Sequence, residues 1–255
     1  TVATNALLER KGTPTLLAIT AGHADALRIG TQHRPRLFER NIQLPSMLYA
    51  AVAEIRERVD AHGEVLVPLD DVQVREALAA ARAAGITAIA IVLMHGWRFT
   101  AHEARVAAIA AELGFAQISV SHRVSPQRKL IGRGDTTVVD AYLSPVLRKH
   151  VDRVAAALGG VALEFMQSNG GLIAAERFAG KDAILSGPAG GLVGAVATAA
   201  QAGFDRIVGF DMGGTSTDVS LVDGERLERS FESVVGGVRV KAPMLRIHTV
   251  AAGGG

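Results

Sequence analysis

The sequence predicts an α/β protein with two lobes, in which parallel and antiparallel sheets are flanked by helices. Apolar, β-rich runs alternate with amphipathic, Ala-rich segments over the first 125 residues, as in a parallel sheet with crossover helices. A long helical pattern and the pair Gly159-Gly160 then end this alternation. Short strands separated by glycine turns fill the remainder, which is typical of antiparallel pairing.

The N-terminal lobe is predicted to be a parallel-sheet unit. Its apolar runs lack polar alternation, which indicates strands buried on both faces. Asp70 or Asp71 can cap a helix that Gly85 closes, and Gly114 stops the next helix. The expected elements are a helix around residue 4, strand 15–20, helix 70–84, strand 86–94, helix 101–113 and strand 117–121.

The C-terminal lobe is predicted to begin near residue 131, which divides the chain into domains 1–130 and 131–255. Its first helix is expected to be interrupted at Pro145. Asp223-Gly224 predicts a hairpin that returns over 227–235. The expected elements are helix 138–158, strand 161–166, a turn at 168–171, a loop at 186–188, helix 189–202, and strands 206–210, 216–222 and 227–235.

Composition excludes several classes of function. The chain has 27 Lys and Arg against 25 Asp and Glu, and a net charge of +2 does not favour a nucleic-acid partner. The absence of cysteine excludes disulfides, thiolate metal sites and a cysteine nucleophile. No apolar run reaches the roughly 20 residues of a membrane span, so no membrane partner is expected. A chain without cysteine fits a reducing compartment, so we expect a cytoplasmic location.

The strongest chemical signal is the string Asp-Met-Gly-Gly-Thr-Ser-Thr-Asp-Val at 211–219, between two predicted strands. Gly213 and Gly214 allow backbone N–H groups to approach an anion closely, and Thr215 adds a hydroxyl donor. Asp211 and Asp218 flank the turn and could hold a hydrated Mg²⁺ or orient a water near a phosphoryl group. The alternative is a plain glycine hairpin with Asp and Thr as turn formers.

Five blocks of sequence together resemble the hydantoinase A/5-oxoprolinase family of the actin-like ATPase superfamily. The string at 210–220 is similar to the second phosphate-binding loop of that superfamily, and the small-residue helix after Pro188 resembles its inter-lobe connecting helix. The resemblance implies a ribonuclease-H-like fold. The blocks are TVATNALLERKG (1–12), MQSNGGL (166–172), LSGPA (185–189), FDMGGTSTDVS (210–220) and PMLRIHTVAAGGG (243–255).

The resemblance implies ATP-dependent opening of a cyclic amide, with ATP and Mg²⁺ as cofactors and 5-oxoproline or an N-methylhydantoin as substrate. Transfer of a phosphoryl group to the oxygen of a poorly electrophilic lactam creates a leaving group, and an anion-cradling loop suits that reaction. A second subunit of the hydantoinase B type and a homo-oligomer are further expectations. Two alternatives stay open: a subunit of an acetone or acetophenone carboxylase complex, and an actin- or chaperone-like ATPase module without lactam chemistry.

The resemblance also implies roles for six residues of the glycine string. Gly213, Gly214 and Thr215 would bind the phosphates, and Asp211 would hold the hydrated metal. Asp218 and Thr217 would support catalysis or orient a water. Family members carry an earlier phosphate loop of the Asp-x-Gly-Gly-Thr kind, which this chain lacks. We therefore expect an internal piece of a longer protein that alone binds nucleotide weakly and turns over nothing.

Weaker candidates have equally good structural explanations. Ser186 and Gly187 open the connecting helix, where N–H groups could face an anion or simply start a helix. Asn169 and Gly170 could touch substrate or form an Asn-Gly turn. His248 is a candidate substrate residue in a strand that runs into the terminal glycines, although a lone strand histidine is usually structural.

Three further features are open at this level. Thr4 could touch phosphate or cap a helix. His95, His102 and Glu103 lack the spacing of a metal site, which favours surface or capping roles. The chain departs from the family pattern at 95–99 and 131–135, where substrate choice could differ.

Overall fold

The computed structural model describes residues 2–31, 36, 38–214, 217–224, 227–250 and 252–254. Its N-terminal part is built on a four-stranded, entirely parallel sheet with the strand order β2-β1-β5-β6. These strands are β1 (Thr15–Thr20), β2 (Tyr49–Ile55), β5 (Ala88–Val92) and β6 (Gln117–Val120). The smaller elements nearby are α2 (Ala26–Ile29), β3 (Arg58–Val59), β4 (Val65–Val67) and α5 (Ser121–Val124).

Helices cover both faces of this sheet. Leu16 and Ala18 of β1 join a core with α3 (Asp71–Ala83) and α4 (Ala101–Glu112). The alternating residues Leu17 and Ile19 join a second core with α1 (Val2–Leu8) and α6 (Leu130–Ala157). Because side chains alternate along a strand and both faces of β1 are covered, all six of its residues are buried, and the four central ones are apolar.

Helix α6 differs from its prediction at both the start and the middle. It begins at Leu130 instead of near 138, and it continues through Pro145 without interruption. Residues 132–143 are all buried, so packing on every side stabilises a helix whose sequence is locally unfavourable. Gly134 leaves room for Leu27 and Val92, since an added Cβ would lie 2.6 Å from the Leu27 side chain.

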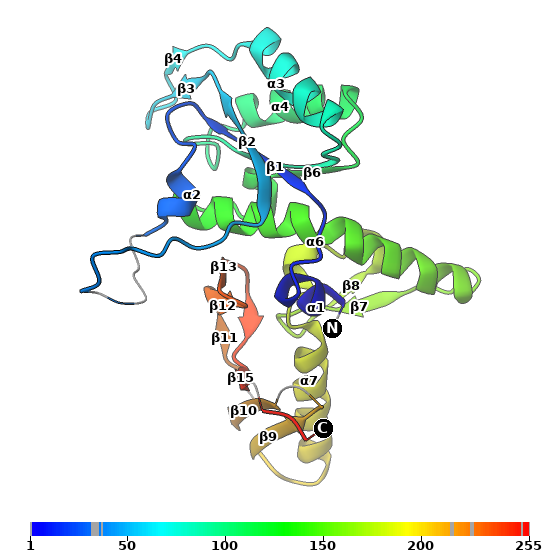
Figure 1. Ribbon diagram of the computed structural model, residues 1–255. Helices are drawn as coiled ribbons and strands as arrows, with labels where there is room; N and C mark the ends of the chain where they lie inside the picture. The colour runs from blue at the N-terminus through cyan, green and yellow to red at the C-terminus, as the bar shows by residue number, and fades with distance from the viewer. Residues whose placement is uncertain are drawn as a thin grey trace.

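The C-terminal part holds small antiparallel sheets around α7 (Ser186–Gln201), on the far side of α6 from the four-stranded sheet (Figure 1). Strands β9 (Arg206–Met212) and β10 (Thr217–Asp223) form a hairpin, and β15 (His248–Val250) pairs with the outer edge of β10. The other elements are β7 (Glu164–Met166), β8 (Leu172–Ala174), η1 (Ala175–Arg177), η2 (Gly180–Asp182), β11 (Arg229–Ser230), β12 (Ser233–Val235), β13 (Val238–Val240) and β14 (Met244–Leu245).

Two predictions for this part were wrong. Residues 186–188 are not a loop but the first turn of α7, where proline is tolerated because its missing N–H has no helical partner there. Residues 227–235 do not return along β10; β11 pairs with β14, and β12 pairs with β13. The hairpin turn of β10 is instead the glycine turn after Met212.

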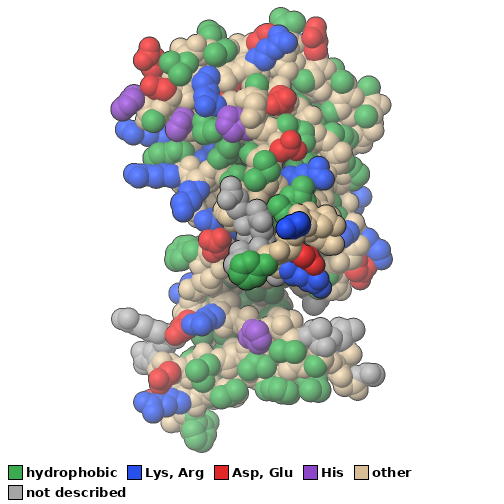
Figure 2. All heavy atoms as spheres, turned by 60° about the vertical axis from the view of Figure 1, so that its left-hand side comes forward, with side chains coloured by type: hydrophobic (Ala, Val, Ile, Leu, Met, Phe, Trp, Pro, Cys, Tyr) green, Lys and Arg blue, Asp and Glu red, His purple; other side chains and the backbone are tan. Residues whose placement is uncertain are grey.

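The two faces of the β9–β10–β15 sheet have different surroundings. On one face, Ile207 of β9 and Val222 of β10 pack against Leu192 of α7. The opposite face carries exposed apolar side chains, and hydrophobic groups lie on the surface of this part of the molecule in Figure 2. They include Val208, Phe210, Met212 and Leu221. Among the described residues, no helix is long and apolar enough to cross a membrane.

Candidate functional site

The two aspartates of the glycine string are direct cross-strand partners. Asp211 lies near the end of β9, Asp218 near the start of β10, and the antiparallel register pairs them. Cross-strand partners share a face of the sheet, with Cβ atoms about 5 Å apart. Asp211 is exposed, whereas Asp218 is half-buried and its Oδ1 accepts a hydrogen bond from Thr249 Oγ1 at 2.6 Å. Two facing carboxylates repel each other, so this pair favours a bound cation.

Carboxylate oxygens are the ligands that Mg²⁺ prefers, and Mg²⁺ usually keeps several waters beside one or two protein carboxylates. Asp211 and Asp218 therefore fit a hydrated Mg²⁺. Within the described part of the chain, no group of three or more acidic or histidine side chains is placed to hold a metal.

The glycine turn lies against the C-terminal segment. Gly254 N donates to Gly213 O at 3.1 Å, and Thr217 Oγ1 donates to Ala252 O at 2.6 Å. The hydroxyl of Thr217 therefore positions this segment, and two glycine-rich pieces of backbone lie side by side. Gly214 is exposed, and a Cβ added to it would meet nothing within 4 Å. Thr215 lies outside the described residues.

His248 belongs to the same sheet but not to the same face as the carboxylates. His248 lies in β15 and pairs with Val219 of β10, whereas its neighbour Thr249 pairs with Asp218. Because successive side chains of a strand point to opposite faces, His248 lies on the face away from Asp211 and Asp218. Its role in substrate binding stays a prediction.

The remaining candidates gather at the start of α7. Ser186 is half-buried and Gly187 is exposed in the first turn. Asn169 Oδ1 accepts from Gly171 N at 2.7 Å, and Gly170 has a φ of +84°, as the turn interpretation requires. No hydrogen bond among the described residues joins these four to Asp211 or Asp218.

Ser168 is the residue here that the sequence did not single out. Its hydroxyl donates to Asp182 O at 2.7 Å and accepts from Leu185 N at 3.0 Å. Its carbonyl accepts from Leu245 N at 2.7 Å. Thr4 Oγ1 donates to the carbonyl of Ile184, beside the same point. Four of the five sequence blocks thus meet at the entrance to α7, and only the glycine string lies elsewhere.

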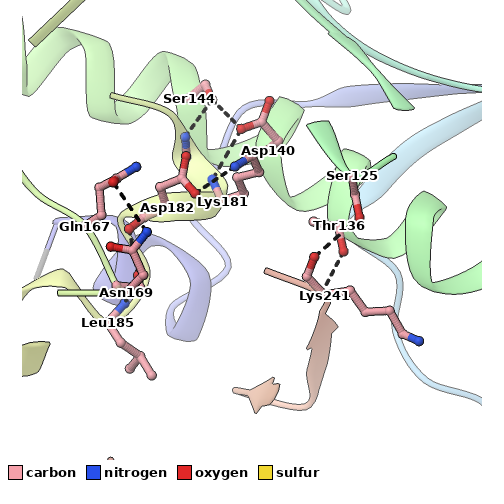
Figure 3. A network of polar contacts seen from close by, with 12 residues as sticks. Ser125, Thr136, Asp140, Ser144, Gln167, Asn169, Lys181, Asp182, Leu185 and Lys241 are labelled. Carbon is pink, nitrogen blue, oxygen red and sulfur yellow. Dashed lines mark hydrogen bonds and ion pairs between the residues drawn. The ribbon is translucent and has the colours of Figure 1, made fainter. Parts of the chain in front are cut away.

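A buried polar network connects this entrance to α6 (Figure 3). Asp140 accepts hydrogen bonds from Ser119 Oγ at 2.7 Å, and from Ser144 Oγ and Lys181 N at 3.3 Å. Burial raises the pKa of Asp140, although the hydrogen bonds from Ser119 and Lys181 oppose that effect. Lys181 Nζ pairs with Asp182 at 2.7 Å. The network fixes η2 against α6.

Two histidines beside the carboxyl ends of the parallel strands each pair with a glutamate. His102 Nδ1 lies 2.7 Å from Glu57, and His122 Nδ1 lies 2.7 Å from Glu103. Both glutamates are buried, and Glu103 also accepts from Leu93 N at 2.8 Å. These pairs pin the carboxyl ends of the parallel strands. The expected surface or capping role is wrong for Glu103, which is fully buried because its carboxylate accepts hydrogen bonds from Leu93 N and Ser121 Oγ.

Two models of one protein family match this chain. Hydantoinase/oxoprolinase N-terminal region matches residues 1–114, and Hydantoinase/oxoprolinase matches residues 133–255. 5-Oxoprolinase 1 of Arabidopsis thaliana is 42% identical over 279 residues, which cover the whole chain and 22% of the relative. The caprolactamase subunit alpha of Pseudomonas jessenii is 33% identical, and the match covers 38% of it. The chain therefore spans a minor part of the length of these relatives.

Solved structures share the fold. The crystal structure of ATP-dependent caprolactamase from Pseudomonas jessenii matches with a TM-score of 0.86 and 33% identity over the whole chain and 38% of its own. A nucleotide-free structure of acetone carboxylase, an enzyme of ATP-dependent acetone carboxylation, matches with a TM-score of 0.87 and 25% identity over 99% of this chain and 38% of its own. The predicted actin-like α/β fold class is confirmed.

Proposed function

Since the chain belongs to the hydantoinase/oxoprolinase family, we propose that it works in an enzyme that couples ATP hydrolysis to the opening of a cyclic amide. The observation that carries this proposal is the facing pair Asp211 and Asp218 beside an exposed glycine turn. Relatives named 5-oxoprolinase and caprolactamase supply the substrate class.

In the proposed reaction, the lactam oxygen attacks the γ-phosphorus of ATP, and ADP leaves with the electron pair of the broken P–O bond. Water then adds to the activated carbon, and cleavage of the C–N bond opens the ring and leaves an acyl phosphate. A second water hydrolyses this acyl phosphate to the carboxylate of the open amino acid and inorganic phosphate. The turn at Gly213 and Gly214 has no Cβ atoms, so its backbone can approach the transferred phosphoryl group. A bound Mg²⁺ would supply charge neutralisation at the phosphates.

The two carboxylates have different environments, which suggests different roles. Asp211 is exposed and is the proposed ligand of the hydrated metal. Asp218 is held by the hydroxyl of Thr249 at 2.6 Å, so its free oxygen keeps one orientation toward a water or the metal shell. Thr217 supports both by holding the segment that contains Ala252.

The test is phosphate release by the complete enzyme with ATP and Mg²⁺, in the presence and absence of 5-oxoproline or ε-caprolactam. We expect the lactam to stimulate release, and Asp211→Asn to lower the stimulated rate about 100-fold. Asp223→Asn is the matched control, because Asp223 lies at the other end of the same hairpin and pairs with Arg206 at 2.9 Å. Equal release with and without any lactam would exclude a coupled cyclic amidase.

A carboxylase subunit is the second candidate, favoured by the likeness to acetone carboxylase. Relatives include subunits of larger enzymes, such as the subunit alpha of caprolactamase, so a partner subunit of the hydantoinase B type is part of the proposal. Ketone-dependent and bicarbonate-dependent ATP hydrolysis, without lactam stimulation, would favour this candidate. ATP hydrolysis that depends on neither substrate would favour an actin- or chaperone-like module.

A further inference from the structure

A half-open cavity of about 560 Å³ lies between α6, the β12–β13 hairpin and the segment 43–48. Its walls are largely apolar, and its volume falls in the range of small-molecule sites. The cavity shares no lining residue with the glycine turn of β9 and β10. Its apolar walls include Leu27, Met47, Leu48, Val138 and Val238.

One buried carboxylate oxygen in this cavity lacks a hydrogen-bond partner. Asp135 of α6 lines the cavity with only 9% of its surface exposed, and its Oδ2 has no hydrogen-bond partner. Arg239 Nε lies 3.1 Å from that oxygen as an ion pair whose geometry does not make a hydrogen bond. A buried carboxylate oxygen without a hydrogen bond is costly, so the site favours a ligand that donates one.

Arg239 is held in place independently of any ligand. Its Nη1 donates to Thr31 Oγ1 at 2.6 Å. Its Nη2 packs on Gly30, where an added Cβ would come within 2.9 Å of it and where φ is +61°. The guanidinium carries five N–H donors, so donors remain for a ligand acceptor. The cavity therefore presents an acceptor, Asp135, directly beside a fixed donor, Arg239.

This pair of groups is complementary to a cis amide. A trans amide points its N–H and C=O in opposite directions, whereas ring closure in a small lactam forces both onto one edge. We propose that the cavity binds a cyclic amide, with the lactam N–H donating to Asp135 Oδ2 and the lactam C=O accepting from Arg239. The methylenes of the ring would lie on the apolar wall formed by Leu27, Val138 and Val238. The choice of a lactam as ligand rests on the proposed function.

The experiment titrates ε-caprolactam into the 255-residue chain without nucleotide, by calorimetry or by ligand-observed NMR. N-methyl-ε-caprolactam is the matched ligand, because it keeps the ring and the carbonyl but lacks the N–H. We expect the N-methyl compound to bind at least about tenfold more weakly. We expect Asp135→Asn to weaken ε-caprolactam binding by a similar factor, and Asp152→Asn, at an exposed position of the same helix, to leave it unchanged.

A second variant guards against loss of the fold. Val238→Phe fills the cavity without altering Asp135 or Arg239, and it should abolish binding of both lactams while circular dichroism stays unchanged. Equal binding of the N-methyl compound, equal binding by Asp135→Asn, or no binding at the highest soluble lactam concentration would overturn the proposal. Lactam-stimulated ATP hydrolysis that survives Asp135→Asn would exclude this cavity and leave the proposed function intact. Lactam binding in this cavity without lactam-stimulated ATP hydrolysis would support the cavity as a lactam site and overturn the proposed function.

Discussion

The buried carboxyl of Asp135 couples stability to pH. Burial raises its pKa from 3.8 to about 6; Glu232 adds to this effect, while Arg239 and Lys241 oppose it. Between these two values the folded chain binds more protons than the unfolded chain, so stability falls as pH rises from about 4 to 6. The difference corresponds to about 3 kcal/mol. Urea unfolding at a series of pH values should show a smaller loss over this window in Asp135→Asn, and identical slopes would contradict the assignment.

Arg133 is a fully buried guanidinium that ties α6 to the carboxyl end of the sheet. Its Nη2 donates to Leu93 O at 2.6 Å, its Nη1 to Gln127 O at 2.8 Å and its Nε to Ser121 Oγ at 2.8 Å. Arg133→Met would leave these three acceptors unsatisfied, so we expect the free energy of unfolding to fall by about 3 kcal/mol. Arg153→Met, at an exposed position of the same helix, is the control in chemical denaturation. A loss below about 1 kcal/mol would show that water replaces the guanidinium.

At the scale of elements, two glycines should respond to alanine with opposite signs. A Cβ on Gly180 of η2 would lie 2.7 Å from the backbone nitrogen of Ser144, so Gly180→Ala must push η2 away from α6. We expect a loss of about 2 kcal/mol. Gly194 is exposed within α7 with nothing inside 4 Å, and Gly194→Ala should gain about 0.5–1 kcal/mol through helix propensity. Thermal unfolding of both variants provides the measurement. Unchanged or higher stability of Gly180→Ala would contradict the packing at η2, and a loss in Gly194→Ala would contradict the propensity argument.

Elements with strong local signals could be predicted, and those fixed by distant contacts could not. Asp70 caps α3 as expected, with its side chain accepting from Gln73 N at 3.0 Å. Strand β2, Tyr49–Ile55, carried no prediction because its Ala and Glu residues are weak strand formers. The first turns of α6 contain Gly132 and Gly134, and glycines usually indicate a loop. Here they make room for the side chains of Lys241 and Leu27, which are distant in sequence.

The candidate site shows the same limit. The string 211–219 predicted two carboxylates beside a glycine turn, but only the strand register makes Asp211 and Asp218 direct partners and places His248 on the other face. The cavity around Asp135 left no sequence signal, because its walls come from α6, β13 and residues 43–48, which are far apart in the chain.

At the scale of the whole molecule, α6 is a shared structural element. One apolar core contains Leu17 and Val92 of the parallel sheet, Val139 and Leu143 of α6, and residues from 175–185 and 240–244. The division into domains 1–130 and 131–255 therefore separates the sheet from the helix that covers one of its faces. We propose that residue 130 marks a change of sheet within one cooperative unit.

Truncation tests this proposal. A fragment of residues 1–130 would expose Leu17, Ile19 and Val92, so we expect it to bind a hydrophobic dye and to melt without a cooperative transition. A fragment of residues 1–157 restores α6 to that face and should recover cooperative melting, because burial of those side chains contributes about 1.5–3 kcal/mol each. Cooperative melting of 1–130 alone, monitored by circular dichroism, would instead show that the boundary separates two independently folding units.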